Sequence, residues 1–270
     1  MIVFPNAKIN LGLYIIGKRP DGFHNLETVF YPVKIQDALE IIHQPGLQET
    51  IFTQSGNHVE VSTESNLCVR AFALLKKEFP QIPFCKIHLH KHIPEKAGLG
   101  GGSADASAML KLLNETFELK ISDEQLASYS LELGSDCPFF IYNRPLLARG
   151  RGEILEPLDI DLSAYSLLIV HPGIGVSTKE AFAGVQANAH HQGKIKQILT
   201  YPPEKWNGVL ENDFEKTVFA AHPAIADIKQ KMLENGALFA SLSGSGSAVY
   251  GIFNRSLSID FPPHYFQKWL

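Results

Sequence analysis

Apolar and polar residues alternate over residues 7–15, which predicts a strand with one buried face. The buried face carries Ile9, Leu11, Leu13 and Ile15, and the opposite face carries Lys8, Asn10 and Tyr14. A polar face on a strand is solvated unless another part of the chain covers it. We therefore expect this strand to be half-buried, with Lys8 and Asn10 on its accessible side.

Similar short apolar runs predict further strands along the chain. They span residues 26–33, 38–43, 86–93, 165–171, 237–242 and 248–253. Helical periodicity and capping residues predict helices between them. These helices run over residues 67–79 after the cap Asn66, from Ser103 to about Phe117, from the capping box of Ser122 and Gln125 to Gly134, from the box of Ser177 and Glu180, and from Pro223 to Gly236.

The strands and helices alternate without a regular βαβ spacing, and the pattern restarts after about Gly152. This organisation favours an α+β fold of two lobes over a doubly wound sheet. The predicted lobes are residues 1–152 and 153–270, joined near Arg149 to Glu156. A length of 270 residues suits two lobes of ordinary size.

The overall composition narrows the possible partners and the compartment. Hydrophobic residues make up 45% and charged residues 19% of the chain, and the net charge is −4, which excludes a broadly basic nucleic-acid binder. No apolar run reaches the roughly 18 residues of a membrane span, and the first residues lack a signal-peptide pattern. Three widely spaced cysteines fit a reducing cytoplasm, and Cys137 is expected to fill the core.

A glycine-rich segment stands between the predicted strand 86–93 and the helix that follows. From Pro94 it reads Pro-Glu-Lys-Ala-Gly-Leu-Gly-Gly-Gly-Ser-Ala. Glycine lets the backbone approach a ligand closely, and the free N–H groups at a helix start bind anions, so phosphate is the expected guest. The pattern differs from a P-loop because no lysine accompanies Ser103, and from a dinucleotide fingerprint because the third glycine is missing.

A second loop, Ser243-Gly244-Ser245-Gly246-Ser247, lies between two predicted strands. By itself it is equally typical of a simple turn. Together with the first loop, it is a candidate to close over a substrate or its phosphates.

Three segments together resemble the small-molecule kinases grouped with galactokinase, homoserine kinase, mevalonate kinase and phosphomevalonate kinase, the GHMP kinases. They are Pro-Asn-Ala-Lys-Ile-Asn-Leu from Pro5, the glycine loop from Pro94, and Leu-Ser-Gly-Ser-Gly-Ser-Ala from Leu242. Asp21-Gly22-Phe23-His24, Gly134 to Phe140 and Val176-Ser177-Thr178 resemble those members that act on a cytidine-diphosphate-linked methylerythritol. The chain departs from the pattern at Phe23, where tyrosine is common, and at Ala104, where a second serine is common.

The resemblance implies a two-lobe fold. The N-terminal lobe would resemble the β-α fold of ribosomal protein S5 and bind the nucleotide, and the C-terminal lobe would be a ferredoxin-like sandwich that binds the substrate. It also implies ATP-dependent phosphorylation of the 2-hydroxyl of that substrate, in the non-mevalonate isoprenoid pathway. The expected protein is a cytoplasmic monomer or homodimer that uses ATP and Mg²⁺ and binds neither nucleic acid nor membrane.

The same resemblance implies roles for individual residues. Asp136 would be the catalytic base, and Lys8 would keep its carboxylate ionised and orient the hydroxyl. Ser103 is the candidate protein ligand of Mg²⁺. The ATP-binding residues would be Pro94, Glu95, Lys96, Ala97, Gly98, Leu99, Gly100, Gly101, Gly102, Ser103 and Ala104. The substrate-binding residues would be Asn10, His24, Phe30, Phe182, Gly244 and Ser245, with Phe30 equally interpretable as core.

Three alternatives stay open at this stage. Another alcohol kinase of the same family would share the motifs, and a ligand sensor on the same fold would have no need of both Lys8 and Asp136. A zinc protein is the third alternative, because His88, His90 and His92 alternate along one strand face.

Overall fold

The computed structural model describes residues 1–57 and 62–270. Its strands are β1 Ile2–Val3, β2 Asn6–Lys18, β3 His24–Gln36, β4 Ala38–His43, β5 Ile51–Gly56, β6 Cys85–Lys91, β7 Leu146–Gly150, β8 Ile154–Pro157, β9 Ser166–His171, β10 Phe239–Leu242, β11 Val249–Phe253 and β12 Phe266–Trp269. Its α-helices are α1 Leu67–Glu78, α2 Gly101–Thr116, α3 Asp123–Leu131, α4 Cys137–Tyr142, α5 Thr178–Phe182, α6 Lys194–Ile198, α7 Glu215–Ala221 and α8 Pro223–Glu234.

The chain forms two compact units that interleave along the sequence. The first unit takes Met1–Ala7, Lys34–Glu95 and Gly100–Arg144, and the second takes Lys8–Val33, Lys96–Leu99 and Pro145–Leu270. The unit boundaries therefore fall inside β2, inside β3, within the glycine loop, and between α4 and β7. The predicted assignment of nucleotide binding to 1–152 and substrate binding to 153–270 stays a prediction.

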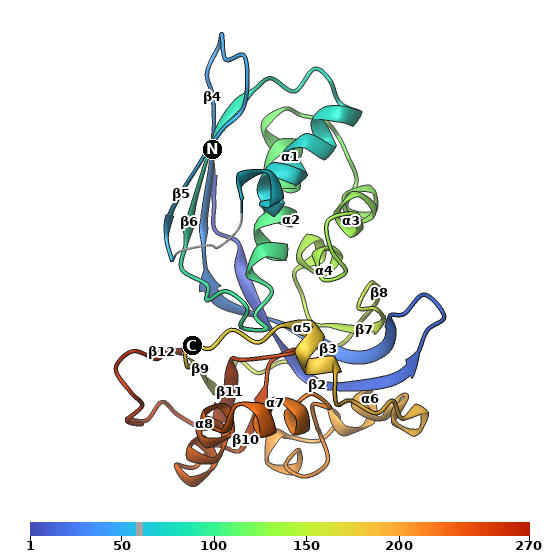
Figure 1. The fold of residues 1–270 in the computed structure, drawn as a ribbon, viewed down its shortest axis with the longest axis vertical. Helices are drawn as coiled ribbons and strands as arrows, with labels where there is room; N and C mark the ends of the chain where they lie inside the picture. The colour runs from blue at the N-terminus through green and yellow to red at the C-terminus, as the bar shows by residue number, and fades with distance from the viewer. Residues whose placement is uncertain (58–61) are drawn as a thin grey trace. The chain divides into compact units, whose positions relative to one another are not determined.

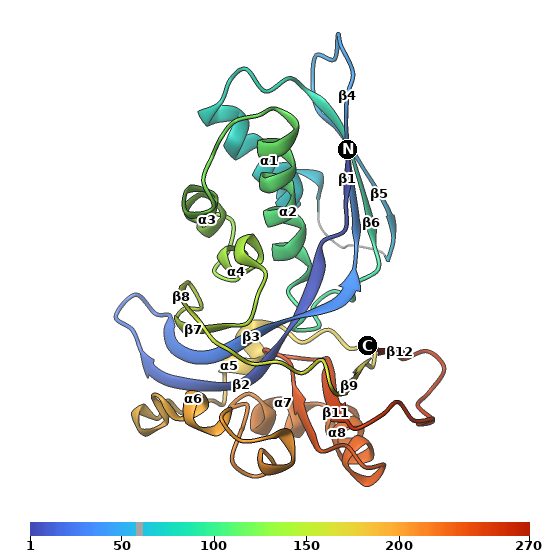
Figure 2. The same ribbon diagram turned by 180° about the vertical axis from the view of Figure 1, so that it is seen from behind.

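The first unit is a sheet covered by helices. Its strands follow the order β1-β4-β6-β5, and only the β5–β6 pair is parallel. Helices α1 to α4 lie on one side of this sheet (Figures 1 and 2). Their buried residues, among them Ala71 and Leu113, share a core with Leu39 and Leu89 of the sheet.

Local capping explains where two of these helices begin. The Asn66 side chain accepts the N–H of Cys68 at 2.9 Å at the start of α1. Ser122 and Gln125 form the expected reciprocal capping box at the start of α3. Both starting points were predicted from the sequence, because a cap depends on residues only two or three positions apart.

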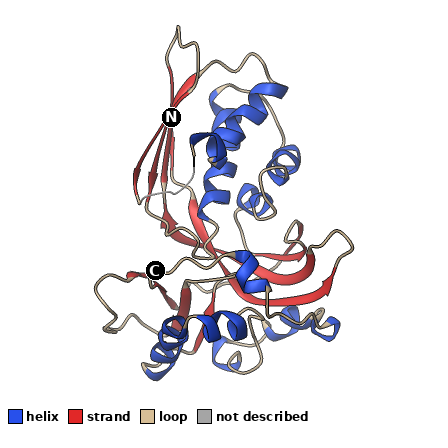
Figure 3. Ribbon diagram, in the orientation of Figure 1, coloured by secondary structure: helices blue, strands red, loops and turns tan. Residues whose placement is uncertain are grey.

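The second unit contains two four-stranded sheets, ordered β2-β3-β7-β8 and β10-β11-β9-β12. Residues of α7 and α8, blue in Figure 3, share a core with the second sheet. That core includes Val218, Ile228 and Met232 from the helices, and Leu13 and Ile15 from β2. A strand near the N-terminus therefore belongs to the hydrophobic core of the C-terminal part of the chain.

Two local predictions are wrong in detail, and the predicted joint between lobes near residues 149–156 stays a prediction. Strand β2 is buried on both faces from Ala7 to Ile15, so it is not half-buried. Residues 149–156 themselves lie in the antiparallel β7–β8 pair of the second unit. Helix α2 begins at Gly101, with Gly100 as its N-cap, so Ser103 lies within its first turn.

The described part of the chain has no helix that is both long and apolar enough to cross a lipid bilayer. Its three cysteines are free and buried.

Candidate active site

Lys8 and Asn10 form a buried polar cluster on β2. Their side chains are 3% and 2% exposed. The Lys8 ammonium donates to Asn10 Oδ1 at 2.6 Å and to the Gly98 carbonyl at 3.0 Å, and it lies 5.1 Å from the centre of the Phe30 ring. Asn10 Nδ2 donates in turn to the Thr28 hydroxyl at 2.9 Å. A buried ammonium needs such acceptors, so Lys8 is held at a defined point beside the glycine loop.

The glycine loop reaches α2 through left-handed backbone positions. Lys96, Gly98 and Gly100 have φ angles of 49°, 73° and 72°. A Cβ atom at Gly98 would collide with the Ser243 carbonyl, so only glycine fits there. Gly100 has no side chain to cap α2, and the first N–H groups of a helix have no partner within it. The N-terminus of α2 thus has the backbone chemistry of an anion site.

The second loop lies directly against the first. Ser243 Oγ donates to the Gly98 carbonyl at 2.9 Å, and the Ala248 N–H donates to the Ala97 carbonyl at 3.0 Å. A Cβ atom at Gly244 would lie 3.2 Å from Asn10 Oδ1. The structure therefore brings Lys8, Asn10, the start of the glycine loop and Gly244 together from three distant parts of the sequence.

Asp136 lies at the start of α4, within the first unit. It is half-buried and is the N-cap residue of that helix. Helix α2 holds this segment, because Ser107 Oγ donates to the Cys137 carbonyl at 2.8 Å. The Ser103 hydroxyl also lies close to Gly134, 3.8 Å from where a Cβ atom would stand. The first turn of α2 and the segment carrying Asp136 are therefore neighbours.

Cys137 is a core residue, as expected. It is fully buried, and burial raises the pKa of its thiol to about 11, against the opposing effect of hydrogen bonds from Ser103 and Ser107. A thiol with this pKa is protonated at neutral pH and is a poor nucleophile.

His24 and Phe182 form an aromatic pair. Their rings stack with centroids 4.6 Å apart and an interplanar angle of 20°, and Phe214 meets Phe182 edge-on at 4.8 Å. Phe30, only 2% exposed, is a core residue that contacts Lys8 rather than a member of this pair. The sequence analysis did not single out Phe214, which ends the segment Asn-Asp-Phe directly before α7.

A buried ion cluster holds both ends of the glycine loop, and sequence reasoning missed it. The Lys91 ammonium binds Asp37 Oδ2 and lies 2.6 Å from Asp105 Oδ2 in α2. Asp37 Oδ1 accepts the N–H groups of His92 and Ile93 at 2.6 and 2.8 Å. Burial raises the pKa of Asp105 to about 7, against the lowering effect of the Lys91 charge. The pattern of apolar residues predicts a strand that includes Lys91, but no nearby residue indicates that Asp37 and Asp105 are its partners.

The alternating histidines of β6 bind hydroxyl groups. His88 Nδ1 and Nε2 lie 2.8 and 2.9 Å from the hydroxyls of Thr53 and Ser55, and His90 Nδ1 lies 2.9 Å from Ser55 Oγ. Across residues 1–57 and 62–270, no three His, Cys, Asp or Glu side chains are grouped as a metal site requires. The structure does not support the zinc alternative.

The chain is similar in sequence to known kinases. The family description "GHMP kinases N terminal domain" matches residues 66–144, and "GHMP kinases C terminal" matches residues 202–260. A 4-diphosphocytidyl-2-C-methyl-D-erythritol kinase of Bacteroides thetaiotaomicron is 52% identical over 254 residues, 94% of this chain and 92% of that protein.

Solved structures agree with the sequence relatives. A crystal structure of 4-(cytidine 5'-diphospho)-2C-methyl-D-erythritol kinase has a TM-score of 0.78 and 30% identity, and covers 93% of this chain and 90% of that one. A homoserine kinase from Cytophaga hutchinsonii has a TM-score of 0.72 at 18% identity, covering 94% of this chain and 85% of that one. The second likeness supports the fold alone.

Proposed function

The chain belongs to the 4-diphosphocytidyl-2-C-methyl-D-erythritol kinases of the GHMP family, and on this basis we propose how its own residues carry out the phosphoryl transfer. Members of this family are ATP-dependent kinases of isoprenoid synthesis. The proposed reaction transfers the γ-phosphoryl group of ATP to the 2-hydroxyl of 4-diphosphocytidyl-2-C-methyl-D-erythritol. The observation that carries the proposal is the buried Lys8 ammonium, held by Asn10 and by the Gly98 carbonyl of the glycine loop.

The glycine loop is the proposed ATP-phosphate site. Its left-handed positions lead into the start of α2, where the first N–H groups have no partner within the helix and the aligned peptide dipoles favour negative charge. Phosphoryl transfer depends mainly on positioning and charge neutralisation, so a rigid cradle of N–H groups suits it. Residues 94–104 are proposed to line this site, and Lys96 is proposed to reach the phosphates.

Asp136 is the proposed base for the acceptor hydroxyl. Its carboxylate would accept the hydroxyl proton as the oxygen attacks the γ-phosphorus atom and the bond from phosphorus to the β-phosphate oxygen breaks. Lys8 is proposed to orient that hydroxyl and to stabilise the negative charge that develops on the transferred group. Its buried position supports this role, because a positive charge acts more strongly where water is excluded.

The stacked pair of His24 and Phe182 is proposed to hold the cytosine end of the acceptor. An aromatic surface suits a flat base, and imidazole nitrogens can hydrogen-bond to the edge of a base. Asn10, Gly244 and Ser245 are proposed to line the path between that pair and the reacting hydroxyl. Phe30, which contacts the Lys8 ammonium, is proposed to flank the cytosine ring together with Phe182.

Mg²⁺ is proposed as the metal that accompanies ATP. When bound with ATP it would supply charge neutralisation at the phosphates, and such an ion often keeps several waters and few protein ligands. The Ser103 hydroxyl, in the first turn of α2, is the protein donor that fits this use. We further propose a cytoplasmic monomer or homodimer that binds no nucleic acid, in keeping with three free thiols and a net charge of −4.

An ADP-release assay with 4-diphosphocytidyl-2-C-methyl-D-erythritol, homoserine and mevalonate tests this function. We expect turnover with the cytidyl alcohol only. ADP release with another of these alcohols, and none with the cytidyl alcohol, would make the chain a kinase of different specificity. Retained binding of both substrates without any turnover would make it a sensor.

The Asp136→Asn substitution tests the proposed base. We expect kcat to fall by about 10²–10⁴-fold, the usual contribution of a general base, while ATP affinity is retained. Asp123→Asn, which changes an exposed carboxylate at the start of α3, is the matched control and should keep full activity. If Asp136→Asn kept most of its kcat, another group would have to accept the proton.

A further inference from the structure

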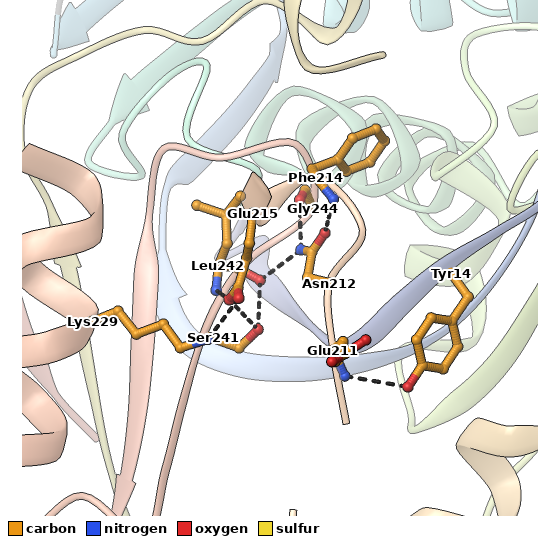
Figure 4. Close-up of polar contacts among 9 residues, drawn as sticks. All are labelled: Tyr14, Glu211, Asn212, Phe214, Glu215, Lys229, Ser241, Leu242 and Gly244. Carbon is orange, nitrogen blue, oxygen red and sulfur yellow. Dashed lines mark hydrogen bonds and ion pairs between the residues drawn. The ribbon is translucent and has the colours of Figure 1, made fainter. Parts of the chain in front are cut away.

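The five residues Glu211–Glu215 form a short connector that contacts three separate parts of the second unit. Figure 4 shows Glu211, Asn212, Phe214 and Glu215 with their polar partners from β2, β10 and α8. Asn212 is only 3% exposed, so its amide needs partners inside the protein. None of these five residues belongs to the three sequence motifs, and the proposed mechanism does not use them.

The connector first fastens β2, the strand that carries Lys8 and Asn10. The Leu13 N–H donates to the Glu211 carbonyl at 2.9 Å, and the Asp213 N–H donates to the Leu13 carbonyl at 2.9 Å. The Ile15 N–H donates to the Asp213 carboxylate at 2.7 Å. These bonds prevent β2 from sliding along its own axis past the connector.

The connector also fastens the Ser243–Ser247 loop. Asn212 Nδ2 donates to the Leu242 carbonyl at 2.9 Å and to the Gly244 carbonyl at 2.8 Å, which lie on either side of Ser243. Glu215 Oε1 accepts the Leu242 N–H at 3.0 Å, and Glu215 is itself paired with Lys229 of α8 at 2.6 Å (Figure 4). Both N–H donors of one buried amide thus hold the end of β10 and the loop that follows it.

The third contact leads to the aromatic pair. Asn212 Oδ1 accepts the Phe214 N–H at 3.0 Å, which fixes the backbone where α7 begins. The Phe214 ring meets Phe182 edge-on at 4.8 Å, and Phe182 stacks on His24. One side chain, Asn212, is therefore bonded to the loop on one side and to the support of the aromatic pair on the other.

We propose that Asn212 is a positioning residue for the acceptor substrate, which sets the Ser243–Ser247 loop and, through Phe214, the His24–Phe182 pair. This inference rests on the proposed function, because it takes that loop and that pair as the acceptor site. Asn212 itself does not touch the substrate. Its two donors and one acceptor fix the distance between two substrate-binding elements that come from different parts of the chain.

Direct calorimetric binding of 4-diphosphocytidyl-2-C-methyl-D-erythritol, without ATP, tests the inference. Asn212→Asp keeps an oxygen for the Phe214 N–H but places a second oxygen against two carbonyls. We expect acceptor affinity to fall by at least about tenfold, and by more than in Asn212→Ala, with a smaller change in ATP affinity. If Asn212 only filled space, Asn212→Ala would lose more acceptor affinity than Asn212→Asp, because aspartate has the same shape as asparagine and alanine is smaller.

Two further variants keep the test decisive. Phe214→Leu leaves Asn212 and its bonds in place but removes the ring against Phe182, and it should also weaken acceptor binding several-fold. Met232→Ala, in the same hydrophobic core, should lower the melting temperature without changing acceptor affinity. Unchanged acceptor binding in folded Asn212→Asp, or in Phe214→Leu if Asn212→Asp does not fold, would overturn the inference. An equal loss of affinity in Met232→Ala would overturn it as well.

The same measurement separates this inference from the proposed catalytic roles. Asp136→Asn should bind the acceptor normally and fail only in turnover. If Asp136→Asn kept its activity while Asn212→Asp lost acceptor affinity, the positioning role of Asn212 would stand and the proposed base would be wrong.

Discussion

Individual buried polar residues in this protein have very different numbers of partners. Lys8, Asn10 and Asn212 are each bonded to several groups that the fold supplies. His171 differs, because it is 8% exposed and its Nδ1 atom accepts the Gly173 N–H at 3.3 Å. Burial lowers the pKa of its imidazole to about 4, against the raising effect of a backbone hydrogen bond with Ile174. A buried group that resists protonation makes stability depend on pH.

His171 is expected to make the fold less stable in acid. The unfolded chain takes up a proton on this residue below its ordinary pKa of about 6.5, whereas the folded chain does so only near pH 4. The contribution is thus fully favourable above pH 6.5 and is lost as the pH falls towards 4. We expect it to account for about 2 kcal/mol of the difference in unfolding free energy between pH 7 and pH 4.5.

Urea unfolding of the wild type and of His171→Leu at both pH values measures this contribution. The variant should lose less stability between pH 7 and pH 4.5 than the wild type does. Equal losses in the two proteins would assign the acid sensitivity to other groups.

At the scale of elements, β6 and α2 are tied together beneath the glycine loop. Asp37 binds the Lys91 ammonium and two N–H groups just after β6, and Lys91 also binds Asp105 in α2. The loop between these elements thus has both of its ends fixed by one buried cluster. Removing one partner of a buried ion pair leaves the other charge uncompensated, at a cost of about 3–5 kcal/mol.

Lys91→Met is expected to affect ATP more than the acceptor. It should lower the unfolding free energy by about 3–5 kcal/mol and raise the KM for ATP, because two buried carboxylates lose their counter-charge below the loop. Acceptor affinity should change little. Steady-state kinetics with each substrate varied in turn, alongside urea unfolding, measures both effects.

Lys76→Met is the control for the loss of a lysine in the same unit. Lys76 is half-buried and donates to the Ile82 carbonyl at 2.6 Å. It should leave both KM values unchanged. If Lys91→Met raised only the KM for the acceptor, the cluster would not act on the ATP loop.

At the scale of the whole molecule, the two compact units are not two consecutive halves of the chain. The second unit takes Lys8–Val33 from near the N-terminus together with Pro145–Leu270. Leu13 and Ile15 of β2 share a core with Leu168, Val249 and other residues of the C-terminal part. A cut after Gly152 would therefore divide a hydrophobic core.

We expect the fragments 1–152 and 153–270 not to fold as independent units. The fragment 153–270 lacks β2 and β3, so it would expose the apolar surface that Leu13 and Ile15 cover. Circular dichroism with urea titration should show no cooperative transition for this fragment, in contrast to the full chain. A sharp transition in the isolated fragment would mean that β2 is dispensable for its core.

Helix starts and strands, which depend on residues close together in the sequence, could be predicted from the sequence. The Asn66 cap, the capping box of Ser122 and Gln125, and the strands on either side of Ser243–Ser247 are all where the sequence placed them. Such signals involve positions a few residues apart, so they survive whatever the rest of the chain does. The family was also predicted, because its three motifs are contiguous stretches of sequence.

What the sequence by itself determined is the family, the glycine loops and most element positions. Only the tertiary structure decided that β2 is covered on both faces, that Lys91 lies between Asp37 and Asp105, and that Asn212 joins the Ser243–Ser247 loop to the aromatic pair. The physical reason is that alternation along a strand reports one buried face and cannot report a second covering layer. Partners of buried polar groups come from distant segments, and no local pattern encodes which segments meet.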